Sequence, residues 1–161
     1  MNYKKLQRTL DVAVEDHRAG RHAEAARGYA AVRSAAPKLF DGWYLAGALA
    51  VNCDRPEEAI PLLQRALRIS PGASQCKLFL GMALADTGKF AEAEKPLRAG
   101  LDQHPNHPEA WENLANAMIA LERPAEAAEC FRRLLALQPD RADVRERIEA
   151  FESRSVAPRC S

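Results

Sequence analysis

Histidine and cysteine side chains are the groups in this chain that could bind a metal ion or act as nucleophiles. The four cysteines lie far apart and form no Cys-x-x-Cys pair: Cys53, Cys76, Cys130 and Cys160. His104 and His107 flank Pro105, but no third ligand follows at the fixed spacing that a metal site requires. We therefore predict that the chain holds no metal ion.

Sequence motifs typical of catalysis are also absent. The chain contains no Gly-x-Gly-x-x-Gly, no Walker-type loop and no Gly-x-Ser-x-Gly. Isolated serine, histidine and aspartate residues occur, but no pattern brings them together. We expect no cofactor and no enzymatic activity.

Composition limits the partners and the compartment. Among 161 residues, 47% are apolar and 28% are charged, which is typical of a folded protein. Lysine and arginine total 23 against 22 acidic residues, so the broad basic surface that nucleic acids or anionic membranes require is not expected. No segment approaches the ~20 apolar residues that cross a bilayer, and the first 16 residues carry scattered charges, unlike a signal peptide. With no cysteine pairing pattern, a reducing cytoplasm is the expected location.

The residues that organise the chain recur every 34 positions. Four prolines keep this step: Pro37, Pro71, Pro105 and Pro139. Four alanines keep it too, Ala25, Ala59, Ala93 and Ala127, and a bulky residue follows each by four: Tyr29, Leu63, Leu97 and Phe131. Three sets in one register predict four structural repeats, over residues 6–39, 40–73, 74–107 and 108–141.

Each repeat has the pattern of two amphipathic helices. In the second repeat, Pro56 opens the second helix, where a proline in the first turn costs no hydrogen bond. The helix is expected to end near Ile69, because a residue before a proline, here Pro71, is driven out of the α region. Gly20 and Gly88 mark the turns within the first and third repeats, where glycine allows a left-handed backbone.

The pattern resembles the tetratricopeptide repeat family, whose signature is Trp-x-x-Leu-Gly-x-x-Tyr, then Ala-x-x-x-Phe, then Pro. The fourth repeat matches most fully, with Trp111, Leu114, Ala115, Met118, Ala127, Phe131 and Pro139. The resemblance implies an all-α, right-handed α-solenoid of four helix-turn-helix hairpins. Val144, Ile148 and Phe151 form one apolar stripe that predicts a C-terminal capping helix over 142–153. The expected domain is 1–154, with a flexible tail over 155–161.

Such a stack has a concave groove lined by the first helix of each repeat. Helical spacing places the following residues on that face: Leu10, Val14, His17, Arg18, Tyr44, Ala48, Val51, Asn52, Leu78, Met82, Asp86, Glu112 and Asn116. We predict that this stripe binds a partner protein or peptide through an apolar face. A second interpretation is that several of these side chains are covered by neighbouring first helices and need no ligand.

Two other functions remain open at the sequence level. The chain could be a structural module that forms homo-oligomers, or an N-terminal repeat domain of a larger enzyme such as a transferase. One function of the family is not expected: its clamp for a C-terminal carboxylate consists of Lys, Asn, Asn, Lys and Arg. The matching positions hold Leu10, Val14, Leu45, Gln75 and Phe79.

Overall fold

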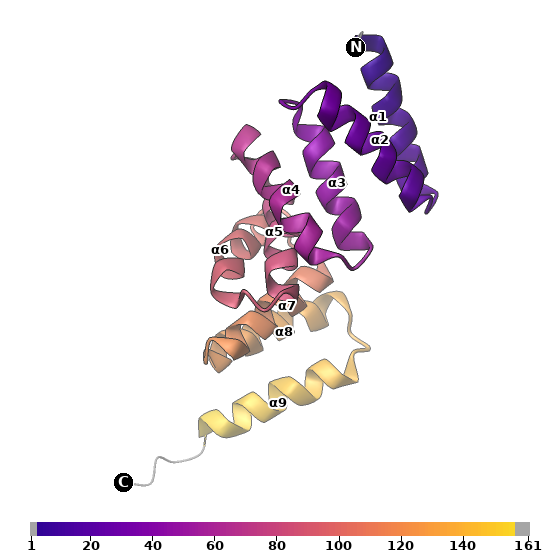
Figure 1. Ribbon diagram of the computed structural model, residues 1–161. Helices are drawn as coiled ribbons and strands as arrows, with labels where there is room; N and C mark the ends of the chain where they lie inside the picture. The colour runs from indigo at the N-terminus through magenta and orange to yellow at the C-terminus, as the bar shows by residue number, and fades with distance from the viewer. Residues whose placement is uncertain (1–2, 157–161) are drawn as a thin grey trace.

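The computed structural model describes residues 3–156, and within that range its regular elements are nine α-helices (Figure 1). They are α1 (Tyr3–Arg18), α2 (His22–Ala35), α3 (Phe40–Asn52), α4 (Pro56–Ile69), α5 (Ser74–Asp86), α6 (Phe90–Leu101), α7 (Pro108–Ala120), α8 (Pro124–Leu137) and α9 (Ala142–Val156). The expected all-α solenoid of four hairpins and a capping helix is confirmed. α9 extends beyond the predicted end at 153, and residues 157–161 of the predicted tail lie outside the described part.

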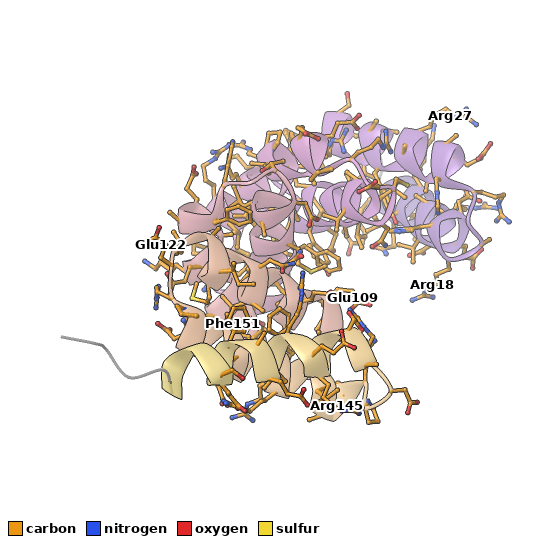
Figure 2. The ribbon with its side chains drawn as sticks, turned by 90° about the horizontal axis from the view of Figure 1, so that it is seen from below. Arg18, Arg27, Glu109, Glu122, Arg145 and Phe151 are labelled. Atoms are coloured by element: carbon orange, nitrogen blue, oxygen red, sulfur yellow. The ribbon has the colours of Figure 1, made fainter. Side chains whose placement is uncertain are left out.

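Helix contacts explain why the stack is curved. Each first helix packs against the second helix of its own hairpin, and α1, α3, α5 and α7 also contact one another in order. Among the described residues, no second helix contacts the second helix of the next hairpin. The first helices therefore lie closer together and line the inner side of the arch seen in Figure 2, where Arg18 and Glu109 both lie on the open side.

The turns inside the four hairpins share one backbone conformation. The second residue after each first helix has a positive φ, at intervals of 34: Gly20 at 75°, Asp54 at 55°, Gly88 at 76° and Glu122 at 58°. The next amide donates back to the carbonyl five residues earlier, as in Arg21 to Asp16 and Arg123 to Met118, both at 2.8 Å. These bonds satisfy carbonyl groups at the helix ends. The turn is thus built in the same way with glycine and without it.

Small residues let the two helices of a hairpin approach closely. Gly47 in α3 lies against Leu63 in α4, and a Cβ atom on Gly47 would stand 2.6 Å from Cγ of Leu63. Ala25, Ala59, Ala93 and Ala127 are fully buried in the second helices. The recurring small residues are therefore required by the distance between the helices.

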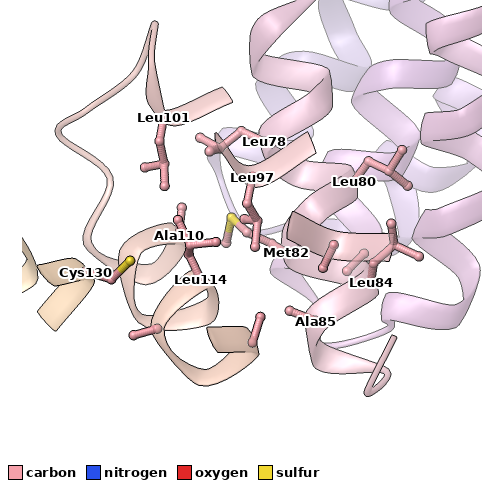
Figure 3. Packing of buried hydrophobic residues seen from close by; sticks show 14 of the residues in the cluster. Leu78, Leu80, Met82, Leu84, Ala85, Leu97, Leu101, Ala110, Leu114 and Cys130 are labelled. Carbon is pink, nitrogen blue, oxygen red and sulfur yellow. The ribbon is translucent and has the colours of Figure 1, made fainter. Parts of the chain in front are cut away.

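The core runs along the stack as two apolar clusters. One contains side chains of α1, α2 and α3, including Tyr29 and Val32. The other extends from α3 to α9, and Figure 3 shows its centre, where Leu97 and Leu101 of α6 face Leu114 of α7. No charged or polar side chain among the described residues is buried. Each hairpin is thus held mainly by apolar contact with its neighbours.

The cap closes the apolar core at α9. Val144 and Ile148 are buried, and the ring of Phe151 stacks on Phe131 with 6.3 Å between centroids. Glu149 is exposed, although the same register position holds Gly81 in the third repeat and Ala115 in the fourth. A charged side chain suits a solvent-facing surface, so α9 covers the last hairpin with one face and meets water with the other.

Candidate binding surface

The thirteen residues predicted to line the groove all lie on first helices. Leu10, Val14, His17 and Arg18 belong to α1, and Tyr44, Ala48, Val51 and Asn52 to α3; Leu78, Met82 and Asp86 belong to α5, and Glu112 and Asn116 to α7. The helices assigned to the concave side from the sequence are therefore the ones that line it. The exposure of the individual side chains differs widely.

Four of the apolar residues in this set are buried. Leu78 has a relative exposure of 1%, and Leu10, Ala48 and Met82 have values between 5% and 7%. Because neighbouring first helices contact one another, apolar side chains on this face pack between them. A Cβ atom on Gly100 would stand 2.7 Å from Cα and Cβ of Leu78, so Leu78 also supports the contact with α6. These four residues belong to the core, as the second interpretation of the stripe expects.

Six residues of the set, including the buried Met82, line a pocket across α3, α5 and α7 that has a volume of about 580 Å³. We name it the central pocket, and its lining residues are Val51, Asn52, Phe79, Met82, Asp86, His107, Glu109, Glu112, Asn113 and Asn116. Six of these ten were predicted. Helical spacing also places Glu109 on the groove face, three positions before Glu112. The predictions missed Phe79, His107 and Asn113, although Phe79 lies three positions before Met82, and Asn113 three before Asn116. That spacing puts each pair on one helical face and could have revealed them.

Amide and carboxylate groups cross-link the walls of the central pocket. Nδ2 of Asn113 in α7 donates a hydrogen bond of 3.1 Å to Oδ1 of Asp86 in α5. Burial raises the pKa of Asp86, and the hydrogen bond from Asn113 acts in the opposite direction. Glu112 accepts two bonds from the Arg141 guanidinium, at 2.9 and 3.3 Å. The charge of Glu112 is therefore neutralised by Arg141, whereas Asp86 is hydrogen-bonded to the neutral amide of Asn113.

His107 stands at the edge of the same pocket, just before α7. Its Nδ1 atom is 3.2 Å from Oε2 of Glu109. The same nitrogen is buried without a hydrogen-bond partner among the described residues. The Glu109 carboxylate lies within ion-pair distance of His107 Nδ1 but out of line for a hydrogen bond with it, since a hydrogen bond also requires alignment. The contact is an ion pair only when the imidazole is protonated.

Aromatic rings form a continuous row from α3 to the start of α7. Phe40 stacks on Tyr44 with 5.3 Å between centroids, Tyr44 meets the edge of Phe79 at 6.1 Å, and Phe79 meets His107 at 6.3 Å. Burial raises the pKa of Tyr44 to about 12. The row joins the second and third repeats, and its Phe79 and His107 end forms part of the central pocket.

The groove has a second depression nearer the N-terminus, with a volume of about 490 Å³. This N-terminal pocket is lined by Leu10, Asp11, Val14, Glu15, Arg18, Asp41 and Leu45. His17 lies at the same end of the molecule, where its Nε2 is 3.1 Å from Nδ2 of Asn52 and its Nδ1 is 3.2 Å from the hydroxyl of Tyr29. The predicted residues His17 and Asn52 thus link α1 to α3 directly.

The arrangement offers binding groups, and the described residues show no metal centre. Within residues 3–156, no group of three His, Cys, Asp or Glu side chains is placed to hold a metal ion. Cys53, in the turn between α3 and α4, has its Sγ 3.3 Å from Nδ1 of His22 at the start of α2. No helix in the described range combines the length and the apolar character that crossing a membrane requires.

Two family models, both described as tetratricopeptide repeat, match the chain, one over residues 16–74 and 80–143 and the other over residues 54–101. Tetratricopeptide repeat protein 7A of Homo sapiens is 30% identical over 95 residues, which are 59% of this chain. The match spans only 11% of the length of that relative.

Solved structures of MamA have a similar backbone. MamA from Desulfovibrio magneticus RS-1 gives a TM-score of 0.79 at 17% identity, covering 94% of this chain and 85% of its own. MamA AMB-1 gives a TM-score of 0.80 at 21% identity, covering 96% of this chain and 84% of its own. At these identities the likeness shows a shared fold.

Proposed function

The chain belongs to the tetratricopeptide repeat family, and from that premise we propose that it is a protein-interaction scaffold that binds a peptide or a helix of a partner in its concave groove. The observation that carries this proposal is the central pocket, to which three successive first helices contribute side chains. Its volume of about 580 Å³ lies within the range of sites that bind small ligands or several side chains.

The lining of the central pocket suits a peptide. Asn52, Asn113 and Asn116 carry amide groups, and each keeps capacity to donate and accept beyond its one bond within the chain, to His17, Asp86 and Arg147 respectively. A peptide backbone presents the same two kinds of group in alternation, so amide side chains can pair with it whatever its sequence. Val51, Phe79 and Met82 supply apolar contact between these polar groups. Backbone pairing and apolar contact together support binding of a peptide segment.

Site-specific photo-crosslinking tests the proposal. A photoreactive amino acid replaces Asn116 in the central pocket, or Gln64 on the exposed side of α4 as a matched control on a second helix. Neither position is buried, so both variants should melt at the wild-type temperature. In the native cell extract, the Asn116 variant should form covalent adducts with a partner, and the Gln64 variant should not.

Two results would contradict the groove as the binding surface. Adducts of equal yield from both positions would show contact that does not depend on the concave face. Adducts whose mass is twice that of the chain would support the alternative of self-association. Mass spectrometry of the cross-linked peptide separates these outcomes, because it identifies both joined segments.

A further inference from the structure

The charge of the concave face differs from that of the whole chain. Three carboxylates line the central pocket, Asp86, Glu109 and Glu112, and three line the N-terminal pocket, Asp11, Glu15 and Asp41. The one lysine or arginine that lines either pocket is Arg18. The full sequence has 23 basic and 22 acidic residues, so its basic side chains lie mostly on other surfaces. Two arginines also contact lining residues of the central pocket, Arg141 at Glu112 and Arg147 at Asn116. Carboxylates remain in excess, and a groove with an excess of one sign of charge attracts ligands of the opposite sign.

Two carboxylates of the central pocket have no lysine or arginine partner among the described residues. Asp86 accepts its hydrogen bond from the neutral amide of Asn113. Glu109 lies beside His107, and its side chain is 65% exposed. Glu112 differs, because Arg141 already neutralises it. Asp86 is on α5 and Glu109 on the neighbouring α7. Both carboxylates line the pocket, where they can accept hydrogen bonds from a cation.

The apolar lining between them fits the stem of a basic side chain. Lysine and arginine have an apolar stem of three or four methylene groups that packs on apolar surface while the charged head stays polar. Phe79, Met82 and Val51 line the central pocket together with Asp86 and Glu109. The Phe79 ring adds an aromatic surface, with which a guanidinium interacts favourably. Desolvation raises the pKa of Asp86, against the effect of the hydrogen bond from Asn113, and a bound cation would stabilise the charged carboxylate.

We propose that the central pocket selects a partner peptide through one arginine or lysine side chain, with its stem on Phe79 and Val51 and its charged head between Asp86 and Glu109. The proposal rests on the proposed function, because it assigns the chemistry of the partner to the same groove. It replaces the purely apolar partner face expected from the sequence with a basic and apolar one. The burial of Leu10, Leu78 and Met82 agrees with this change, since little of the apolar stripe is open.

Selection from a random heptapeptide library displayed on phage tests the proposal with three versions of the full chain. The first is the wild type, and the second is Asp86→Asn/Glu109→Gln, which removes both charges. Asparagine at 86 can still accept the hydrogen bond from Asn113, so the fold should be kept. The third is Glu57→Gln/Glu92→Gln, which removes two charges from the first turns of α4 and α6, away from the groove.

Peptides selected by the wild type and by the Glu57→Gln/Glu92→Gln control should share an arginine or lysine at one position. The same peptides should bind Asp86→Asn/Glu109→Gln about tenfold more weakly, since two partly exposed ion pairs are lost. Replacing the shared arginine by citrulline, which has the same shape without the charge, should weaken wild-type binding to a similar extent. The citrulline peptide should bind the wild type and Asp86→Asn/Glu109→Gln with similar affinity.

Other outcomes separate this proposal from the broader one. Neutral or acidic peptides that photo-crosslink to a probe at Asn116 would overturn the basic preference and leave the groove as the binding site. Basic peptides that bind all three versions equally would also overturn it. Failure to select any peptide above the level of phage without an insert would count against peptide binding in the groove altogether.

Discussion

Gly81 in α5 lies so close to Leu97 in α6 that a Cβ atom on Gly81 would stand 2.6 Å from Cγ of Leu97 and 2.7 Å from its backbone nitrogen. A side chain could turn away, but the backbone nitrogen belongs to a helix and cannot move without shifting α6. The smallest residue is therefore required at this register position in the third repeat. The contact sets the distance between the two helices at the centre of the stack.

Replacing Gly81 by alanine should lower the free energy of unfolding by about 1–3 kcal/mol, because the added methyl group overpacks the helix contact. Alanine favours helix by about 1 kcal/mol over glycine, so any loss is a minimum for the packing cost. Urea unfolding followed by circular dichroism measures the change. Gly72→Ala is the control, since a Cβ there meets nothing within 4 Å. A loss of similar size in both variants would contradict this account of Gly81.

The repeat period predicted the hairpins and the small residues well, because positions 34 residues apart are structurally equivalent in successive hairpins. It did not predict the left-handed conformation of Asp54 and Glu122, since neither residue type requires a positive φ. At these two positions the backbone hydrogen bonds of the turn, which recur in each hairpin, override the preference of Asp and Glu for a negative φ.

The period also could not separate the buried from the open residues of the groove. Helical spacing places Leu78 and Asn116 on one side of their helices, but the exposure of each depends on how closely the next helix approaches. That distance follows from contacts such as Gly100 against Leu78, which involve other helices. His107 was missed for a further reason: it lies outside the helical pattern, in the turn before α7.

Thiol reactivity should divide the cysteines by burial. Burial raises the pKa of the Cys76 thiol to about 12 and that of Cys130 to about 11, so almost no thiolate forms at pH 8. Cys53 is partly exposed. In a Cys160→Ser background, Ellman's reagent at pH 8 should modify one thiol quickly and the other two only after denaturant is added.

A Cys53→Ser change in that background should remove the fast phase and leave the slow one. The rate of the slow phase should rise with urea concentration, because the reagent reaches Cys76 and Cys130 through opening of the helices. Three thiols that react at one fast rate in the native protein would show that the packing around Cys76 and Cys130 is open.

His17 should make stability depend on pH. Burial first, and the neighbouring His22 second, lower its pKa below the ordinary histidine value of 6.5. The unfolded chain then binds more protons than the folded one as pH falls through 6.5, so stability is fully present above that value and declines below it. Because Nδ2 of Asn52 can only donate, the Nε2 atom of His17 must accept, and its protonation removes this link between α1 and α3.

Urea unfolding at pH 7.5 and pH 5.0 measures this effect in the wild type and in His17→Gln. The glutamine variant should be less stable at pH 7.5 and should lose less stability on acidification, because its side chain at position 17 takes up no proton. Equal losses in the two proteins would assign the pH dependence to other groups.

The capping helix should be needed for stability through its buried stripe. Val144 in α9 is completely buried against the core, so Val144→Asp would place a carboxylate among apolar side chains without a partner. Such a change typically costs about 3 kcal/mol, or raises the pKa of the new group until it is neutral. Ala150→Asp adds the same side chain at an exposed position of the same helix and should cost less than about 1 kcal/mol.

Urea unfolding of both variants measures the difference, which should narrow at pH 3, where the new carboxyl group at 144 is protonated. Equal stability of the two variants at neutral pH would show that α9 does not form part of the cooperative core.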